Sequence, residues 1–329
     1  MNNLNKKVIV FGAAGFIGSH LIERLLNEDY KVYAFDLVPI EKSKNLRNVI
    51  NNTKLKYTVG NITNKKDVED FFNPDASTVY HLASVVGVRK YIDDPLGVID
   101  TIVFGSRNII DLCVKHKTRI LFASTSEIYG KNPNFPWKED GDRVLGDPSV
   151  DRWSYSTSKA LVEHMLFPLY RANKLDFSTV RFFNVYGPRQ NPIYVVSQTI
   201  YRILRNEKPD VYDGGIQTRC FTYIDDIIEG LFLAGTRKEA LGNVFNLGSQ
   251  QPTNMRTIID LCINISKKNI SINELETKNH YGEKYQDIID RIPDSSKASN
   301  LLGWRAKITP EEGIKKIYDW IKNNDWYLD

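Results

Sequence analysis

Short apolar runs alternate with amphipathic segments through the first half of the chain. The runs are four to six residues long and begin at Val8, Lys31, Leu55, Thr78, Arg119 and Phe177. Runs of this length are typical of buried strands, whereas the segments between them repeat apolar residues at helical spacing, most extensively over 97–116 and 155–172. This regular succession predicts an α/β fold, a doubly wound parallel sheet with helices on both faces.

The alternation loosens after about residue 185. Prolines and glycines interrupt this region, and helical patterns return at 195–206, 224–236, 253–267 and 309–323. We expect residues 1–185 to form the larger domain, rejoined by segments at about 221–248. Residues 186–329 are expected to form mainly a smaller C-terminal domain that covers the carboxyl edge of the sheet.

The composition narrows the functional classes. The 329 residues carry a net charge of +4, and lysines and arginines are spread along the chain, which argues against a nucleic-acid partner. No apolar run approaches the roughly 18–20 residues that a membrane span requires, and we expect no membrane partner. The three cysteines are far apart and form no CxxC pair, so we expect no disulfide, no metal site and a cytoplasmic location.

A glycine-rich turn follows the first expected strand. It contains Gly12, Gly15 and Gly18, with Phe16 and Ile17 at the start of the next helix. Glycines let the backbone approach a pyrophosphate closely, and a helix N-terminus supplies free N–H groups and a favourable dipole. This strand–turn–helix context predicts a dinucleotide site on a Rossmann sheet.

Asp36 ends the second expected strand, 18 residues after Gly18. A carboxylate at this place accepts hydrogen bonds from the adenosine ribose and repels a 2′-phosphate, so we expect NAD as the cofactor. The topology predicts further cofactor contacts at the ends of the third and fourth strands, at Asn61, Ile62, Ala83 and Ser84.

A candidate catalytic group lies at the end of the fifth strand and the start of the following helix. Tyr155 and Lys159 are four residues apart and therefore share one helical face. We expect Lys159 to lower the pKa of the Tyr155 phenol and to hold the nicotinamide ribose, so that a phenolate acts as general base on a sugar hydroxyl. Thr125 can hydrogen-bond the same hydroxyl.

With these residues the sequence resembles the extended short-chain dehydrogenase/reductase family, over residues 8–320. Further matches lie at 183–189, 217–221 and 302–304. The resemblance implies that NAD binds in the N-terminal domain and a nucleotide sugar in the C-terminal one. It also implies that Asn184 and Arg219 contact the diphosphate or ribose of that substrate, and that the two long helices pair with a second copy in a homodimer.

Within that family the chain is most similar to UDP-glucuronate decarboxylases. The similarity lies at 125–127, 151–159 and 281–293. It implies that Ser126, Glu127 and Arg291 surround the sugar carboxylate and that Tyr285 contacts the nucleotide. Oxidation at C4 makes a β-keto acid, which loses CO2 because the carbanion is delocalised as an enolate. Decarboxylation of UDP-glucuronic acid or a related nucleotide uronate is therefore the favoured reaction.

Two other reactions of the family stay open. The stretch 87–89 resembles UDP-glucuronate 4-epimerases, which makes Arg89 a candidate substrate-binding residue and 4-epimerisation the alternative reaction. A dehydratase usually carries Asp-Glu after the strand-end threonine, whereas this chain has Ser126 and Glu127. The loop 208–212 is one residue shorter than the usual nucleotide-pocket pattern, and a UDP-sugar remains the expected substrate.

Overall fold

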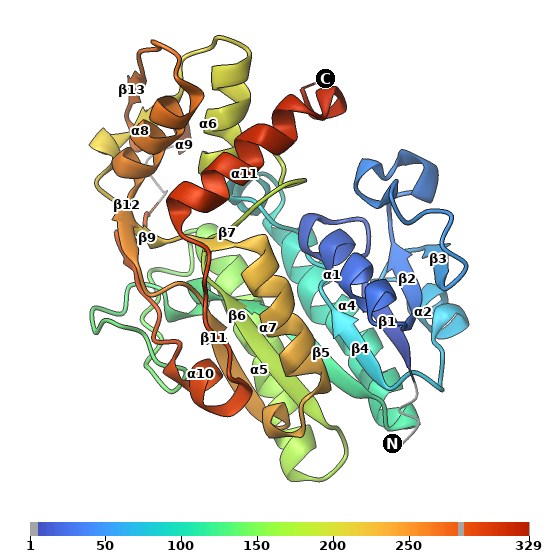
Figure 1. Ribbon diagram of the computed structural model, residues 1–329. Coiled ribbons are helices and arrows are strands. Elements are labelled where there is room, and N and C mark those ends of the chain that lie inside the picture. The colour runs from blue at the N-terminus through green and yellow to red at the C-terminus, as the bar shows by residue number, and fades with distance from the viewer. Residues whose placement is uncertain (1–5, 282–285, 329) are drawn as a thin grey trace.

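The computed structural model describes residues 6–281 and 286–328 (Figure 1). Seven parallel strands form the main sheet, in the spatial order β3-β2-β1-β4-β5-β6-β11. The strands are β1 (Lys7–Phe11), β2 (Lys31–Asp36), β3 (Leu55–Val59), β4 (Thr78–His81), β5 (Arg119–Thr125), β6 (Phe177–Phe182) and β11 (Asn243–Leu247). The expected doubly wound α/β fold is confirmed.

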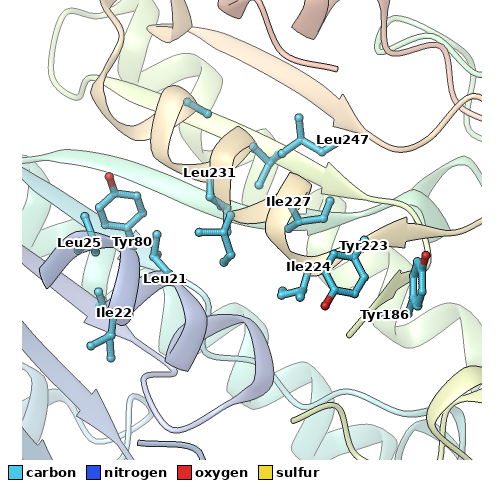
Figure 2. Packing of buried hydrophobic residues seen from close by; sticks show 14 of the residues in the cluster. Leu21, Ile22, Leu25, Tyr80, Tyr186, Tyr223, Ile224, Ile227, Leu231 and Leu247 are labelled. Carbon is cyan, nitrogen blue, oxygen red and sulfur yellow. The ribbon is translucent and has the colours of Figure 1, made fainter. Parts of the chain in front are cut away.

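Two helical layers cover the sheet because successive residues of each strand point to opposite faces. Val8 belongs to the apolar cluster on one face, and Ile9 to the cluster on the other. Figure 2 shows the first face, where side chains of two helices pack with Tyr80 and Leu247 of the sheet. The helices of this layer are α1 (Phe16–Asn27) and α7 (Ile224–Thr236). Those of the second layer are α2 (Lys65–Phe71), α4 (Pro95–His116) and α5 (Arg152–Arg171).

The direction of strand succession reverses at β1, which lies between β2 and β4. At such a switch point the connections leave the carboxyl ends of neighbouring strands toward opposite faces, and a crevice opens between them. The glycine turn after β1, helix α3 (Val88–Asp93) after β4 and the 3-10 helix Ser126–Tyr129 after β5 all follow these carboxyl ends. The fold thus brings the candidate residues to one edge.

A smaller group of elements lies beyond that edge, at the top of Figure 1. Its helices α6, α8 and α11 pack on one another, and their apolar side chains continue the core of the first layer. Small sheets pair β7 with β10, β9 with both β12 and β14, and β8 with β13.

The remaining elements include those of this smaller group and α10, which packs on β11 and α7 of the larger one. The helices are α6 (Val195–Leu204), α8 (Met255–Ser266), α9 (Thr277–Tyr281), α10 (Ser296–Leu302) and α11 (Pro310–Lys322). The strands are β7 (Val185–Tyr186), β8 (Asp210–Tyr212), β9 (Thr218–Cys220), β10 (Thr222–Tyr223), β12 (Pro252–Asn254), β13 (Asn273–Leu275) and β14 (Asp290–Arg291). Further 3-10 turns are Ile40–Lys42, Lys44–Leu46, Asp213–Gly215, Lys238–Ala240 and Asp325–Tyr327.

Most long elements lie where the hydrophobic pattern predicts them. One difference matters for the site: α5 begins at Arg152, before the expected start at residue 155. The small sheets and α10 have no clear signal in the pattern. No helix among the described residues is long and apolar enough to cross a membrane.

Asp226 of α7 fixes the path of the chain between α10 and α11. Its buried carboxylate oxygen Oδ2 accepts hydrogen bonds from the backbone N–H groups of Lys307 (2.9 Å) and Ile308 (3.0 Å). Its backbone oxygen accepts one from Trp304 Nε1 at 2.7 Å. One residue therefore ties the C-terminal segment to α7.

We expect Asp226→Ala to lower the free energy of unfolding by about 2–4 kcal/mol, because two backbone N–H groups lose their acceptor. Urea denaturation measures this loss. Asp225→Ala is the matched control, since Asp225 is exposed on the same turn; its effect should stay within about 0.5 kcal/mol. Equal losses in the two variants would contradict the role given to Asp226.

Candidate active site

A cavity of about 1010 Å³ opens at the carboxyl edge of the sheet. The ends of β1, β2, β4 and β5 contribute to its wall, and it extends to Arg291 of β14. Every residue expected to bind the cofactor and every residue expected to be catalytic lies on this wall. They are Gly12, Gly15, Phe16, Ile17, Gly18, Asp36, Asn61, Ile62, Ala83, Ser84, Thr125, Ser126, Glu127, Tyr155, Lys159 and Arg291.

The glycine turn is too tight for side chains. Gly12 has a φ of +83°, and a Cβ there would lie 2.6 Å from the backbone nitrogen of Ala83. A Cβ on Gly18 would overlap the carbonyl oxygen of Gly12. Gly15 caps α1 without any side-chain acceptor, so the first N–H groups of the helix stay available for a pyrophosphate. These residues fit a dinucleotide.

Asp36 is held rigidly at the end of β2. Its Oδ2 accepts a hydrogen bond from Ala14 N at 2.9 Å, and its Oδ1 accepts one from Val38 N at 3.1 Å. Each carboxylate oxygen has a second lone pair, which can accept from a ribose hydroxyl. The free acceptor positions of Asp36 therefore fit the ribose of NAD.

Tyr155 and Lys159 come from the first turns of α5. The side chains of Thr125 and Tyr91 are close enough to the Tyr155 hydroxyl to act against the rise in its pKa described below. Its ring stacks on that of Tyr91, with centroids 4.5 Å apart and planes 9° from parallel. Lys159 Nζ donates to the carbonyl oxygen of Ala123 at 2.8 Å.

The electrostatics of this pair differ from the expectation. Burial raises the pKa of Tyr155, and the nearby Glu127 carboxylate raises it further. Burial also lowers the pKa of Lys159 to about 7, although Glu163 acts in the opposite direction. The expected lowering of the phenol's pKa by Lys159 is thus wrong for the protein's own groups, because both side chains share one poorly solvated site. A phenolate at Tyr155 requires additional positive charge.

A buried network behind Lys159 fixes α5 on the sheet. Glu163, one turn further along the helix, accepts hydrogen bonds from Ser124 Oγ (2.5 Å) and from Arg181 Nε (3.1 Å) and Nη2 (2.6 Å). Arg181 Nη1 donates in turn to the hydroxyl of Tyr129 at 2.7 Å. The network holds β5, β6 and α5 in one arrangement, which fixes the backbone of the catalytic group.

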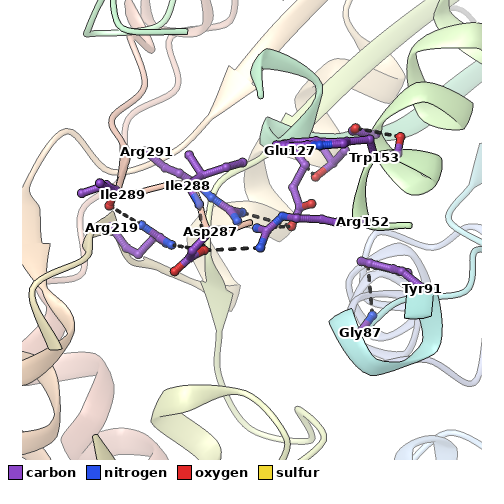
Figure 3. Close-up of polar contacts among 12 residues, drawn as sticks. Gly87, Tyr91, Glu127, Arg152, Trp153, Arg219, Asp287, Ile288, Ile289 and Arg291 are labelled. Atoms are coloured by element: carbon purple, nitrogen blue, oxygen red, sulfur yellow. Dashed lines mark hydrogen bonds and ion pairs between the residues drawn. The ribbon is translucent and has the colours of Figure 1, made fainter. Parts of the chain in front are cut away.

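A second cluster, which we call the ion chain, consists of Arg291, Glu127, Arg152, Asp287 and Arg219 (Figure 3). Glu127 Oε1 is 3.2 Å from Arg291 Nη1 and 3.7 Å from Arg152 Nη2. Asp287 Oδ1 is 3.3 Å from Arg152 Nη1 and 3.4 Å from Arg219 Nη2. Each carboxylate therefore lies between two guanidinium groups.

The ion chain joins two parts of the fold. Glu127 and Arg152 follow β5 and begin α5, whereas Arg219 and Arg291 are register partners in the β9–β14 pair. Burial would raise the pKa of Glu127, but the charges of Arg291 and Arg152 outweigh it and lower that pKa. Burial and the nearby arginines act on Asp287 in the same two directions, and its pKa is also lowered. Both Glu127 and Asp287 are therefore carboxylates at neutral pH.

Three buried polar atoms of cavity residues have no hydrogen-bond partner among the described residues. They are Glu127 Oε2, Arg291 Nε and Asn184 Oδ1. A buried polar group without a partner costs about 1–3 kcal/mol. These atoms therefore mark where a polar ligand or water binds. Within the same described ranges, no group of three or more His, Cys, Asp or Glu side chains is arranged to hold a metal ion.

The expected substrate residues are only partly brought together. Asn184 lines the cavity, but Arg89 is exposed on α3, 3.9 Å from Asp93, and is absent from the cavity wall. Arg219 is buried, is absent from the cavity wall and joins the ion chain through Asp287. Tyr285 lies outside the described residues.

Arg152, Asp287 and Tyr91 are the neighbours of the catalytic group that sequence reasoning missed. Arg152 had a usable signal, because it lies three residues before Tyr155 and so shares a helical face with it once α5 is extended. Asp287 lies in the stretch 281–293 that carries the similarity to decarboxylases, but nothing in the sequence pairs it with Arg152. Tyr91 had no signal, since its position depends on tertiary packing.

Known proteins resemble this chain over nearly its whole length. The family model described as GDP-mannose 4,6 dehydratase matches residues 9–317. The chain is 31% identical over 322 residues to the UDP-N-acetyl-alpha-D-glucosaminuronate decarboxylase of Bacillus cytotoxicus, which covers 97% of this chain and 98% of the relative. It is 32% identical over 352 residues to the bifunctional polymyxin resistance protein ArnA of Wigglesworthia glossinidia brevipalpis. That match covers 97% of this chain and 52% of ArnA, so the chain spans about half of that relative.

A solved structure has the same architecture. The UDP-glucuronic acid 4-epimerase of Bacillus cereus, in complex with UDP-glucuronic acid and NAD, superposes with a TM-score of 0.83. The two are 30% identical, and the match covers 96% of this chain and 99% of the epimerase. Decarboxylases and epimerases thus share this fold.

The buried Lys159 predicts a pH-dependent stability. Its pKa of about 7 in the fold lies below its ordinary 10.5, so the folded protein binds fewer protons than the unfolded chain between these values. The cost of burying the ammonium is therefore fully present below pH 7 and disappears as the pH rises toward 10.5. We expect Lys159→Met to raise the melting temperature by a few degrees at pH 6 and by less at pH 9.

Scanning calorimetry at the two pH values measures the difference. Lys174→Met, at an exposed lysine, should show no such dependence on pH. A Lys159→Met variant that is destabilised equally at both values would show that the ammonium is not held at a cost.

Proposed function

The chain belongs to the family described as GDP-mannose 4,6 dehydratase, within the extended short-chain dehydrogenase/reductases, and we propose that it decarboxylates a nucleotide uronate. It is an NAD-dependent enzyme that modifies a nucleotide sugar. UDP-glucuronic acid is the first candidate substrate. The name of the Bacillus cytotoxicus relative supports its 2-acetamido analogue as the second.

The proposal is supported most directly by two guanidinium groups that share one carboxylate. Arg291 and Arg152 both face Glu127 Oε1, at 3.2 and 3.7 Å. The ion chain as a whole has three guanidinium groups for two carboxylates, and Arg291 Nε has no partner among the described residues. A substrate carboxylate would balance this charge and accept the Nε hydrogen. With a neutral hexose, the excess positive charge would stay unbalanced and Arg291 Nε would stay without an acceptor.

The proposed first step is oxidation at C4. Tyr155 takes the proton of the C4 hydroxyl while Thr125 hydrogen-bonds the same oxygen. NAD, when bound, supplies a hydride acceptor and a positively charged ring. Lys159 orients the ribose of the cofactor, and the glycine turn binds its pyrophosphate through backbone N–H groups.

The resulting 4-keto uronate is a β-keto acid. Its bond between C5 and the carboxylate breaks, CO2 leaves, and the electron pair moves onto the C4 oxygen as an enolate. Arg291 first orients the carboxylate and then stabilises the enolate charge. Water then supplies the proton that C5 gains, with Ser126 and Glu127 as our candidates for relaying it, and the enolate becomes the 4-ketone. Tyr155 finally returns its proton to the C4 oxygen as the hydride returns to C4.

The remaining assignments are part of the same proposal. Residues 1–185, with about 221–248, would hold NAD, and 186–329 would mainly hold the nucleotide sugar. Asn184 and Arg219 would contact the diphosphate or ribose, which the unpartnered Asn184 Oδ1 supports. The three cysteines are free and buried, which supports a reducing, cytoplasmic location.

The second candidate is 4-epimerisation of the same uronate. The likeness to the Bacillus cereus epimerase at 30% identity favours it, as does the stretch 87–89. It requires the same cofactor and the same tyrosine, so only the product separates the two reactions.

Incubation of the purified protein with NAD and either UDP-uronate, followed by mass spectrometry, tests the proposal. We expect a product lighter by the mass of CO2. Tyr155→Phe should lower kcat by about 10²–10⁴-fold, because the general base is lost. Tyr30→Phe, outside the cavity, should keep the wild-type rate. An unchanged mass with a new isomer would mean epimerisation, and no reaction with either substrate would contradict the proposal.

We also propose a homodimer in which α4 and α5 pack against the same helices of a second copy. The two helices lie side by side, and Phe104 of α4 and Leu161 of α5 are 59% and 43% exposed. Exposed aromatic and aliphatic side chains on adjacent helices favour such an interface. The family resemblance points to the same pairing.

We expect Phe104→Glu to weaken the dimer by about 100-fold or more, because a buried carboxylate without a partner opposes association. Light scattering after size exclusion measures the mass. Ile216→Glu is the control, since Ile216 is 67% exposed and lies away from both helices. A wild-type monomer, or a Phe104→Glu dimer as stable as the control, would contradict this pairing.

A further inference from the structure

Arg152 lies between the two carboxylates of the ion chain but not on the cavity wall (Figure 3). Its Nη2 faces Glu127 at 3.7 Å, its Nη1 faces Asp287 at 3.3 Å, and its side chain is only 1% exposed. It is the first residue of α5, so the helix that carries Tyr155 also fixes its backbone. Among the described residues, Arg152 therefore reaches the site through Glu127.

Glu127 and a substrate carboxylate compete for the same cation. Arg291 pairs with Glu127 at 3.2 Å, and it is also the proposed partner of the substrate carboxylate. Two carboxylates beside one guanidinium repel each other, and one of them then takes up a proton. With a second guanidinium, two carboxylates face two cations and both can stay ionised.

We propose that Arg152 is a positioning residue that keeps Glu127 in place as a carboxylate while Arg291 turns to the carboxylate of the substrate. This inference rests on the proposed function, because it requires a uronate. Asp287 holds Arg152 from the other side, and its own Oδ1 is fixed by a hydrogen bond from Ile288 N at 2.8 Å. Arg291 can therefore exchange Glu127 for the substrate carboxylate while Glu127 keeps its ion pair with Arg152.

Other titratable groups around Glu127 do not replace Arg152. Burial raises the pKa of each neighbouring phenol, to about 12 for Tyr194, so these groups stay neutral near pH 7. The ionisation of Glu127 therefore depends on its charged neighbours. The groups that face it are Arg291 of β14, Arg152 and Tyr155 of α5, Asp287 before β14, Tyr91 of α3 and Tyr194 before α6.

Proton uptake on binding tests the proposal without any turnover. UDP-glucuronic acid is titrated calorimetrically at pH 7 into the NAD-loaded Tyr155→Phe protein, in two buffers of different ionisation enthalpy. With Arg152 present we expect almost no proton uptake. With Arg152→Met added, about one proton per site should be taken up, because Glu127 and the substrate then share only Arg291.

Two comparisons separate this role from a structural one. Arg152→Lys keeps a positive charge and should restore low proton uptake. UDP-glucose has no carboxylate, and it should cause no extra uptake in the Arg152→Met protein. Arg143→Met is the control, since Arg143 is an exposed arginine outside the ion chain that donates to the Ile128 carbonyl oxygen; it should behave as the parent protein. If the Met variant does not fold, Arg152→Gln is measured with the same expectation.

The outcomes distinguish this inference from the proposed function. A protein that binds and decarboxylates the uronate, but whose Arg152→Met variant takes up no additional proton, would overturn the role of Arg152 alone. The role of Arg152 would also be overturned if the Arg152→Lys protein takes up as many protons on binding as the Arg152→Met protein. A wild-type protein that binds neither UDP-uronate would overturn both proposals.

Discussion

Glu127 and Asp287 lie among three arginines, and the free energy of removing these charges from water is offset only while each carboxylate keeps its cations. This constraint fixes the position of α5 relative to the β9–β14 pair, because the ion pairs cross between them. In the proposed function it also selects a ligand that carries a carboxylate. A carboxylate can replace one partner of Arg291 and keep the charge balanced, whereas a neutral group cannot.

The two ends of the cavity are built from different parts of the chain. Backbone groups form the cofactor end, through the tight turn at Gly12 and the N-terminus of α1. Charged side chains form the substrate end, through Glu127, Arg152 and Arg291. Relatives named as a decarboxylase and as an epimerase both match this chain over nearly its whole length, so the fold alone does not distinguish the two reactions.

Local spacing was sufficient to predict the sheet, the glycine turn, Asp36 and the pair Tyr155 and Lys159, because each depends on neighbours in sequence. It did not predict the ion pair between Arg152 and Asp287, whose members are 135 positions apart in the chain. Nor did it predict the pKa of Tyr155, since burial is a property of the packed structure. The expected contact of Arg89 with the substrate depends on how the short helix α3 is oriented. The spacing of apolar residues along the chain does not determine that orientation.

The most direct measurement is a crystal structure of the Tyr155→Phe protein with NAD and UDP-glucuronic acid. The account predicts that the sugar carboxylate lies within hydrogen-bonding distance of the Arg291 guanidinium. It also predicts that Arg152 still faces Glu127, with the C4 hydroxyl at Thr125. A carboxylate that points to solvent or toward Arg89, with Arg291 still paired to Glu127, would contradict the central claim that this cluster recognises a uronate.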